Sequence, residues 1–477
     1  MEEALIPQDD AGDEAGEAGP SREDRLLLLC CNAVLLSQYI VVTVPSSYFP
    51  QWGDGHGMGT AMVGLVFAVQ GAGTVIASVS VVPLMDRLGV RHTIVGGLLL
   101  GAAMTALFGL SPVLLGTGGG SCTPGLLALF VGSRLLNGFF AGCAEVGAYA
   151  VVTSRFRGDG VGKAMAGLEL CAGLGCMIGP VVGGTVYSAA RGLGTQAAFA
   201  APMLACAVLA VGTALVLRLP ALHGAFANGT GEEGGEGGRA VPVRELLRGH
   251  TAPIALNMAA CLMSGAMFNV LAPTLPLQLQ QVFGYDESSV GRILMIPGGV
   301  FLVLSMGVGT MMDNWREAAE AKAPGLSAAG VTMEIQRKLH WLLAAAFFLF
   351  VLGFLSLGPV LPPGSAQLSE TELCTKYRWT MWLGLSVYGL GCVFSLLPTL
   401  PLIQAHTPKD NEHVDATLSG WWNGAYAAGA AIGPLLGGAL NAQLDFSGQC
   451  AVTAVLCLLF SVVYLITMPR RVPAAPK

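Results

Sequence analysis

The sequence has little charge and few aromatic residues for a chain of its length. Charged residues make up 11% of the 477 residues and aromatic residues 7%, whereas hydrophobic residues reach 53%. A soluble domain carries about 25% charged residues, so this shortage argues against a fold that is surrounded by water. The net charge of −6 argues against a nucleic-acid-binding surface. Together with a mean hydropathy of +0.64, the composition indicates a protein that lies largely in a membrane.

The sequence also lacks the motifs of common catalytic and metal centres. It contains no phosphate-binding loop, zinc motif or nucleophile elbow, and its 12 cysteines have no metal-ligand spacing. We therefore expect no enzymatic activity, no cofactor and no metal site. The acidic N-terminus has no positively charged n-region, so the first apolar stretch is predicted to be a retained helix and not a signal peptide.

Apolar stretches of about 20 residues recur along the chain, and each is long enough to cross the roughly 30 Å hydrocarbon core as a helix. A transmembrane barrel is disfavoured, because stretches such as the one from Thr93 are apolar on all sides and do not alternate. We predict an all-α membrane protein with 12 transmembrane helices in two six-helix halves. The predicted spans are residues 25–46, 61–84, 93–115, 125–152, 164–189, 197–219, 252–275, 289–312, 340–362, 379–404, 415–441 and 449–468.

The polar segments between these spans predict the domain organisation. A Gly/Glu-rich stretch in the middle of the chain cannot bury a core and is typical of a flexible linker. Of the 24 Lys and Arg residues, 19 fall on the side of the termini, which predicts that both termini are cytoplasmic. The predicted units are a disordered acidic cytoplasmic N-terminus (1–24), an N-terminal six-helix half (25–219), a cytoplasmic linker (220–251), a C-terminal six-helix half (252–468) and a cytoplasmic tail (469–477).

A repeated motif relates the two halves. The run IGPVVGG that begins at Ile178 returns as IGPLLGG from Ile432, and Gly64 matches Gly291 at an offset of 227 residues. Such a parallel duplication predicts a substrate cavity at mid-membrane between the halves. The small residues of the motif allow neighbouring helices to approach closely, and the prolines permit bending. The residues predicted to form this helix-packing motif are Gly175, Gly179, Pro180, Gly183, Gly184, Gly433, Pro434, Gly437 and Gly438.

Three charged residues, Arg134, Glu145 and Glu169, lie well inside the predicted spans, away from the ends of the helices. A charge at a helix centre costs about 2.5–3.5 kcal/mol on insertion scales and is usually retained for function. Glu145 and Glu169 reach similar depth, and as a pair facing a cavity they would exchange a proton or a cation near neutral pH. The structural alternative for both is a carboxylate that reaches the cytoplasmic boundary. Arg134 lies in the other half of the membrane. Three roles are open for it: it would shift the pKa of a nearby acid, hold a carbonyl freed by Pro180, or serve a purely structural purpose.

Uncharged residues in the spans supply further candidates. A cation is attracted by aromatic rings, which makes Tyr39, Phe67, Trp422 and Tyr426 candidates for the cavity wall, although most aromatics in such a chain serve packing. The polar cavity candidates are Asn32, Gln38, Gln70, Asn137, Asn269, Tyr388 and Asn423.

The loop between the second and third spans has the composition of a gate. Gly89 permits a tight turn, and Asp86 beside Arg87 and Arg91 can form charge-assisted bonds that tie helix ends together in one conformation. The alternative is a solvated loop that carries positive charge on the cytoplasmic side.

These motifs resemble those of a known family. The gate loop, the Arg134-x-x-Asn137-Gly138 motif and the glycine motif from Gly175 resemble signatures of the major facilitator superfamily. The runs PSSYFPQWGDGHGMGTAMVGLVFAV and GLELCAGLGCMIGPVVGGTVY are similar to the vesicular amine transporter family, and to its polyamine branch more than its monoamine branch. The resemblance covers roughly residues 25–470 and implies a drug/proton antiporter-like protein. It also implies that Glu169 corresponds to an acidic residue that the polyamine branch has before its glycine motif. The acids of the monoamine branch in helices 1, 10 and 11 have no counterpart, so monoamine specificity does not follow.

The residues and the resemblance together predict a proton-coupled antiporter that moves a cationic amine, polyamine-like or a related organic cation, by alternating access. Two alternatives stay open: a facilitator of a neutral or anionic metabolite, and a non-transporting membrane receptor on the same fold. The expected partners are a small-molecule substrate, protons and the lipid bilayer. The chain is expected to be monomeric and to reside in a vesicular or vacuolar membrane more than in the plasma membrane.

Overall fold

The computed structural model describes residues 21–117, 120–156, 159–219, 251–322, 328–358, 370–405 and 412–468. Within these ranges every regular element is helical, which confirms the predicted fold class. The predicted linker and C-terminal tail, and most of the predicted N-terminal tail, lie outside the described residues. The first helix begins at Arg22, because Ser21 caps it by accepting a hydrogen bond from the backbone N–H of Asp24.

The helices fall into two sets along the chain. The first set comprises α1 (Arg22–Thr43), η1 (Val44–Ser47), α2 (Phe49–Gly55), α3 (Thr60–Leu88), α4 (Val90–Leu115), α5 (Pro124–Arg155), α6 (Asp159–Ala190), η2 (Arg191–Leu193) and α7 (Thr195–Leu217). The second set comprises α10 (Thr251–Asn269), α11 (Leu275–Phe283), α12 (Glu287–Lys322), α13 (Ala328–Leu357), α14 (Glu370–Leu396), α15 (Thr399–Gln404) and α16 (Glu412–Thr467).

The described residues contain 11 candidate membrane spans, judged by length and composition. The last of them, Gly420–Thr467, has 48 residues, about twice the length that one crossing needs. It lies in α16, which bends at Asp445, where φ is 63°. This bend falls between the predicted spans 415–441 and 449–468. The count of 12 crossings requires that α16 crosses twice, and it stays a prediction.

Two helices extend well beyond the apolar stretches that predicted them. The predicted span 289–312 is part of α12, which continues to Lys322, and the predicted span 340–362 begins inside α13, which starts at Ala328. The additional residues are rich in Ala, Glu, Lys and Arg, which favour a helix without being apolar. Hydropathy marks only the part of a helix that lies in the membrane, so it places these ends too close to the membrane.

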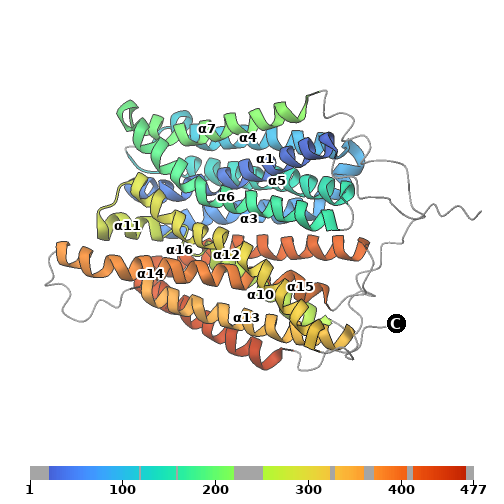
Figure 1. Ribbon diagram of the computed structural model, residues 1–477. Helices are drawn as coiled ribbons and strands as arrows, with labels where there is room; N and C mark the ends of the chain where they lie inside the picture. The colour runs from blue at the N-terminus through green and yellow to red at the C-terminus, as the bar shows by residue number, and fades with distance from the viewer. Residues whose placement is uncertain are drawn as a thin grey trace, which may run out of the picture.

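The two sets form two bundles of nearly parallel long helices, one above the other in the view of Figure 1. The core of the first bundle contains a cluster of rings in tilted and edge-to-face contact, formed by Phe49, Phe108, Phe130 and Phe199. Between the bundles, α3 packs against α16 and α6 packs against α12. The short helices α2 and α11 pack on each other at one end of the molecule, here called the α2/α11 end. The opposite end, where α1 begins at Arg22, is here called the terminal end.

Candidate substrate and proton site

The repeated motif forms both contacts between the bundles. A Cβ placed on Gly64 of α3 would lie 2.3 Å from the Pro434 carbonyl oxygen on α16, and one placed on Gly291 of α12 would lie 2.3 Å from the Pro180 carbonyl oxygen on α6. Both pairs are related by the internal repeat. We call these contacts the two seams; each requires glycine, because any larger residue would push the backbones apart.

Most glycines within the motif face away from the seams, toward other helices of their own bundle. A Cβ on Gly175, Gly179 or Gly183 would collide with residues of α1 or η1. A Cβ on Gly433 would collide with the backbone of α10, and one on Gly437 with the Val270 carbonyl just after α10. These glycines therefore pack α6 and α16 inside their own bundles. Gly184 and Gly438 complete the seams, next to the backbone of Glu287 and of Thr60. One face of the motif thus packs against helices of its own bundle, and the other face packs against the opposite bundle.

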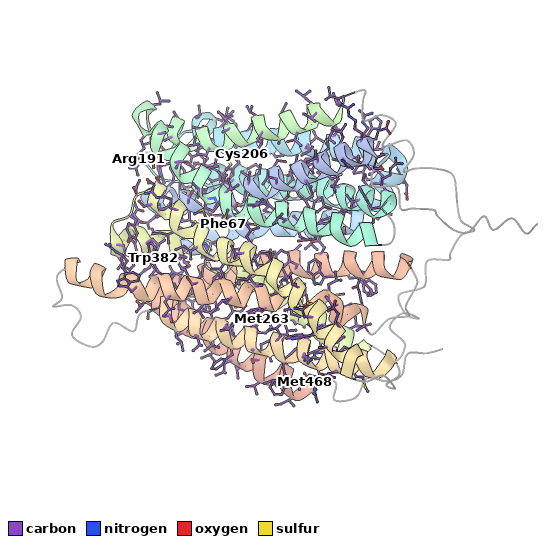
Figure 2. All side chains as sticks on the ribbon, in the orientation of Figure 1. Phe67, Arg191, Cys206, Met263, Trp382 and Met468 are labelled. Carbon is purple, nitrogen blue, oxygen red and sulfur yellow. The ribbon has the colours of Figure 1, made fainter. Side chains whose placement is uncertain are left out.

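Polar contacts close the space between the bundles at the α2/α11 end. Gln51 of α2 donates from Nε2 to the Pro276 carbonyl at 3.2 Å, and Thr60 donates to the Gly438 carbonyl at 3.1 Å. Arg191 of η2, which Figure 2 shows at this end of the molecule, forms an ion pair with Glu287 of α12. All three contacts join the first bundle to the second.

The seams do not continue to the terminal end. A Cβ on Gly307 of α12, or on Gly420 or Gly424 of α16, would meet nothing within 4 Å in the described part of the chain. Among the described residues, the close contacts between the bundles therefore lie toward the α2/α11 end.

Both intramembrane glutamates accept a hydrogen bond from a tyrosine. The hydroxyl of Tyr39 on α1 donates to Glu145 on α5 at 2.8 Å, and the hydroxyl of Tyr149 on α5 donates to Glu169 on α6 at 2.8 Å. The two carboxylates are near enough to interact electrostatically. The structure thus brings together the two acids that their depth in the membrane predicts to be neighbours.

The two carboxylates differ in their access to solvent. Glu145 is 7% exposed, whereas Glu169 is exposed and interacts electrostatically with Tyr426 of α16. Because Tyr426 belongs to the second bundle, Glu169 opens to the space between the bundles. Glu145 lies behind it, inside the first bundle.

Aromatic side chains of the second bundle stand opposite the acids. The ring centroid of Phe268 lies 6.4 Å from that of Tyr426 and 5.9 Å from that of Phe301, and Phe301 reaches to within 3.8 Å of a Cβ built on Gly173 of α6. Glu169 thus lies opposite the aromatic side chains of Phe268, Phe301 and Tyr426, here called the aromatic wall. An acid that faces aromatic rings suits an organic cation.

Three residues of this site, Tyr149, Phe268 and Phe301, are not among the candidates predicted from the sequence. Tyr149 follows Glu145 by four residues, so helical spacing already places it on the same face. Phe268 and Phe301 carry no comparable signal, because phenylalanine in an apolar helix is ordinarily a packing residue.

Arg134 is separate from the acids. It is 3% exposed, donates to the Val42 carbonyl at the end of α1 at 3.2 Å and lies 5.5 Å from the ring centroid of Phe108. No described carboxylate forms an ion pair with it. The carbonyl that Arg134 holds in this structure belongs to Val42, next to the break between α1 and η1 beside Pro45. A role beside Pro180 stays a prediction.

The polar cavity candidates are divided between the bundle interiors and the space between them. Asn137 donates to the Gly101 carbonyl and to Thr105 of α4, and Tyr388 donates to the Met267 carbonyl, so both serve packing inside one bundle. Gln38 and Gln70 are also buried, and both amide atoms of Gln70 are without a partner among the described residues. Asn32, Asn269 and Asn423 are half-buried.

The gate loop has the turn that the sequence predicts but a different set of contacts. Gly89 has φ of 80° between α3 and α4. Arg91 donates from Nε and Nη2 to the Leu217 carbonyl at the end of α7, at 3.2 and 2.9 Å, while Asp86 and Arg87 are exposed. In this conformation Arg91 ties α4 to α7 and leaves Asp86 accessible. The latch formed by Asp86 and the two arginines stays a prediction for another conformation.

Comparisons with known proteins agree with this geometry. The family model of the Major Facilitator Superfamily matches residues 31–412. The MFS-type transporter SLC18B1 of Homo sapiens is 25% identical to 98% of this chain, over 93% of its own length. The Mus musculus protein of the same name is 24% identical to 95% of the chain, over 89% of its length.

Two solved structures share the fold. A mutant of the nucleoside transporter NupG aligns with a TM-score of 0.65 and 11% identity over 93% of this chain and its own full length. A bacterial homolog of the human lysosomal transporter Spinster, in an inward-facing and occupied conformation, aligns with a TM-score of 0.64 and 12% identity, over 94% of this chain and 97% of its own. At these identities the likeness extends to the fold alone.

Proposed function

Because this chain belongs to the major facilitator superfamily, we propose that it is a proton-coupled antiporter that moves a cationic amine across a membrane by alternating access. It is a multi-pass integral membrane protein that transports a small molecule, and it is not an enzyme. The finer assignment rests on one observation: Glu145 and Glu169 each accept a hydrogen bond from a tyrosine hydroxyl, and Glu169 faces the aromatic residues of the other bundle.

The two carboxylates supply a physical basis for exchange. A protonated carboxyl group has no negative charge with which to hold an ammonium group, and an ammonium group bound to the carboxylate disfavours protonation. Proton and amine therefore compete for the same site. If each bundle arrangement opens the site to one side only, binding of one species on one side drives release of the other on the opposite side.

Glu169 is the primary candidate, because it opens to the space between the bundles, and Glu145 is the second acid behind it. The aromatic rings of Phe268, Phe301 and Tyr426 would cover the apolar part of an organic cation and attract its charge. Orientation follows from the Lys/Arg bias, which favours cytoplasmic termini, and the resemblance to vesicular amine transporters favours a vesicular membrane.

Uptake into proteoliposomes under an imposed pH gradient tests this function. We expect Glu169→Gln to reduce proton-driven uptake of an amine about 10- to 100-fold, which corresponds to the loss of a charge-assisted bond. Glu23→Gln, an exposed residue in the first turn of α1, is the matched control and should transport normally. Full uptake by Glu169→Gln would refute the mechanism.

The same assay separates the two alternatives. A facilitator of neutral or anionic metabolites would transport without dependence on the pH gradient. A receptor would show no counterflow with any substrate. A screen of polyamines, monoamines and organic-cation drugs identifies the substrate class.

A further inference from the structure

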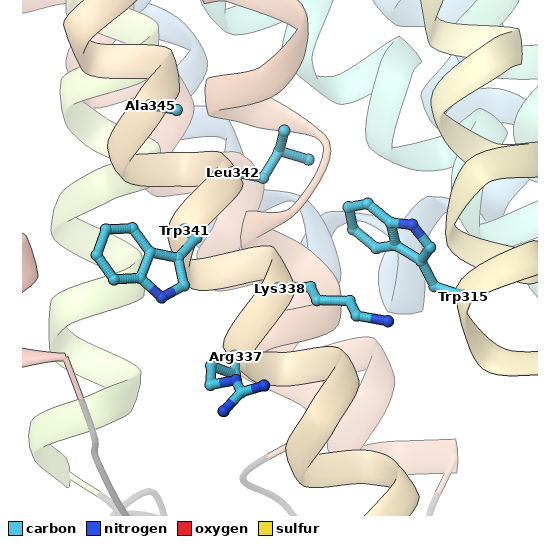
Figure 3. Close-up of a pocket in the computed structure, with 6 residues that line it drawn as sticks. All are labelled: Trp315, Arg337, Lys338, Trp341, Leu342 and Ala345. Carbon is cyan, nitrogen blue, oxygen red and sulfur yellow. The ribbon is translucent and has the colours of Figure 1, made fainter. Parts of the chain in front are cut away.

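A groove lies on the outside of the second bundle, away from the seams. It has a volume of about 550 Å³ and is lined by Trp315 of α12 and by five residues of α13: Arg337, Lys338, Trp341, Leu342 and Ala345. Figure 3 shows Lys338 between the two indole rings, with its side chain extended toward Trp315, and Arg337 below Trp341 in this view. The Lys338 ammonium lies 5.6 Å from the centroid of the Trp315 ring. We call this feature the α13 groove.

The α13 groove lies where α13 enters the membrane. The candidate span of α13 is Met333–Leu357, so Arg337 and Lys338 lie near its start, at the terminal end. Trp341 is 54% exposed one turn further along. Tryptophan and basic residues at the end of a span are typical of the membrane–water interface, where the ring lies among lipid headgroups.

An exposed apolar stripe continues from the groove along the same helix face. Phe348, Leu352 and Leu355 are 49%, 43% and 51% exposed, and their spacing from Trp341 by 7, 11 and 14 residues places them on one side of α13. A cationic end and a long apolar stripe thus form one continuous surface, which matches the two parts of a lipid molecule.

The charges of the groove favour an anion. Lys338 pairs with Glu334 at 3.2 Å, which offsets one of the two positive charges. Arg337 is exposed, makes no ion pair with a described residue and presents a planar guanidinium that suits a phosphate. Among the described residues at the groove, one positive charge therefore remains unbalanced at headgroup depth.

We propose that the α13 groove binds an anionic glycerophospholipid, with the headgroup phosphate on Arg337 and Lys338 and an acyl chain along the stripe from Trp341 to Leu355. Free phosphate has no part that would use the stripe, and a zwitterionic lipid gains less from the net positive charge. The occupied groove would fill the space between α12 and α13 with lipid at the terminal end.

Binding of defined lipids to the purified full-length protein in detergent, measured by native mass spectrometry, tests this site. We expect phosphatidylserine to bind more tightly than phosphatidylcholine with the same acyl chains. Arg337→Gln should weaken phosphatidylserine binding about five-fold, the usual effect of one basic residue at an anionic membrane surface. Arg218→Gln, an exposed arginine at the same end of the molecule, removes the same charge outside the groove and should bind normally.

A second variant separates charge from shape. Ala345→Trp fills the groove without altering its charge and should weaken phosphatidylserine binding at least as much as Arg337→Gln. Unchanged binding in both variants would overturn the proposal, as would equal binding of the two lipids. Displacement of phosphatidylserine by equimolar soluble glycerophosphoserine would also overturn it, because the site would then recognise the headgroup alone.

Discussion

Gly291 of α12 lies directly against the carbonyl oxygen of Pro180 on α6, at a distance where a Cβ on the glycine would come within 2.3 Å of that oxygen. The repeat-related pair, Gly64 and Pro434, has the same separation on the other side of the molecule. Two backbones that touch without intervening side chains can slide or separate as rigid surfaces. In the alternating access proposed above, the seams would be the moving contacts, and in this structure they are closed at the α2/α11 end.

Gly291→Val should open one seam. The larger side chain would collide with the α6 backbone. Overpacking of this kind lowers the free energy of unfolding by about 1–3 kcal/mol. We expect lower thermal stability and a transport rate reduced at least several-fold, measured by thermal unfolding in detergent and by uptake in proteoliposomes. Gly212→Val on α7, where a Cβ meets nothing within 4 Å, is the control. Equal behaviour of the two variants would show that the seam tolerates separation.

The ion pair between Arg191 and Glu287 should stabilise the arrangement that is closed at the α2/α11 end. Glu287 is 5% exposed at its side chain and Arg191 52%, so the pair is only partly screened by water. In Arg191→Gln we expect a cysteine introduced at Val181, beside Gly291, to react a few-fold faster with a membrane-impermeant maleimide, in a Cys122→Ser background. The exchanged pair Arg191→Glu with Glu287→Arg should restore slow labelling. Fast labelling of the exchanged pair would mean that the charges do not hold the seam.

Tyr149→Phe should change the pH dependence of transport. The Tyr149 hydroxyl donates to Glu169 and so stabilises the charged carboxylate relative to the protonated form. Without this donor the proton is held up to a higher pH, and we expect the midpoint of the pH–uptake profile to rise by about one pH unit. Tyr285→Phe, a ring stacked on Phe283 at the α2/α11 end, is the control. An unshifted midpoint, with uptake merely lower, would indicate that Tyr149 has only a structural role.

Cys176 offers a probe of the site without any substitution. It is half-buried on α6 and interacts electrostatically with Glu145 and Glu169. We expect a small cationic methanethiosulfonate to react with it from the terminal end, and an amine substrate to protect it. Cys206, buried in the first bundle, should stay unmodified, as peptide mass spectrometry can verify. Labelling of Cys176 that substrate does not slow would place the substrate elsewhere.

Much of the fold is already present in the sequence. Apolar length predicts membrane helices, because hydrocarbon leaves no other partner for backbone polar groups than the helix itself. Hydropathy predicts helices shorter than α12 and α13, because it detects only the apolar part of a helix and not the part that extends into water. The bend at Asp445 carries no sequence signal of comparable strength, because a single residue with positive φ depends on the packing of the helices it joins.

The candidate site was predictable only in part. The free-energy cost of placing a charge inside the membrane predicts a functional role for Glu145 and Glu169. Their depth in the membrane follows from the rise per residue of a helix. Their tyrosine donors come from α1 and α5, and the aromatic residues opposite them come from α10, α12 and α16. No pattern within one helix shows which face a distant helix will cover. Asn137 illustrates the same limit, because its polarity suggested the cavity whereas its partners lie on α4.

The sequence by itself determined that this protein is a membrane protein of two related halves with two acids at one depth, because hydropathy, repetition and helical rise are properties of the chain. The tertiary structure decided which glycine face joins the bundles, that Glu169 opens between them while Arg134 holds the end of α1, and that one end of the molecule is closed. These depend on contacts between residues more than 90 positions apart, which helix packing brings together and no local pattern encodes.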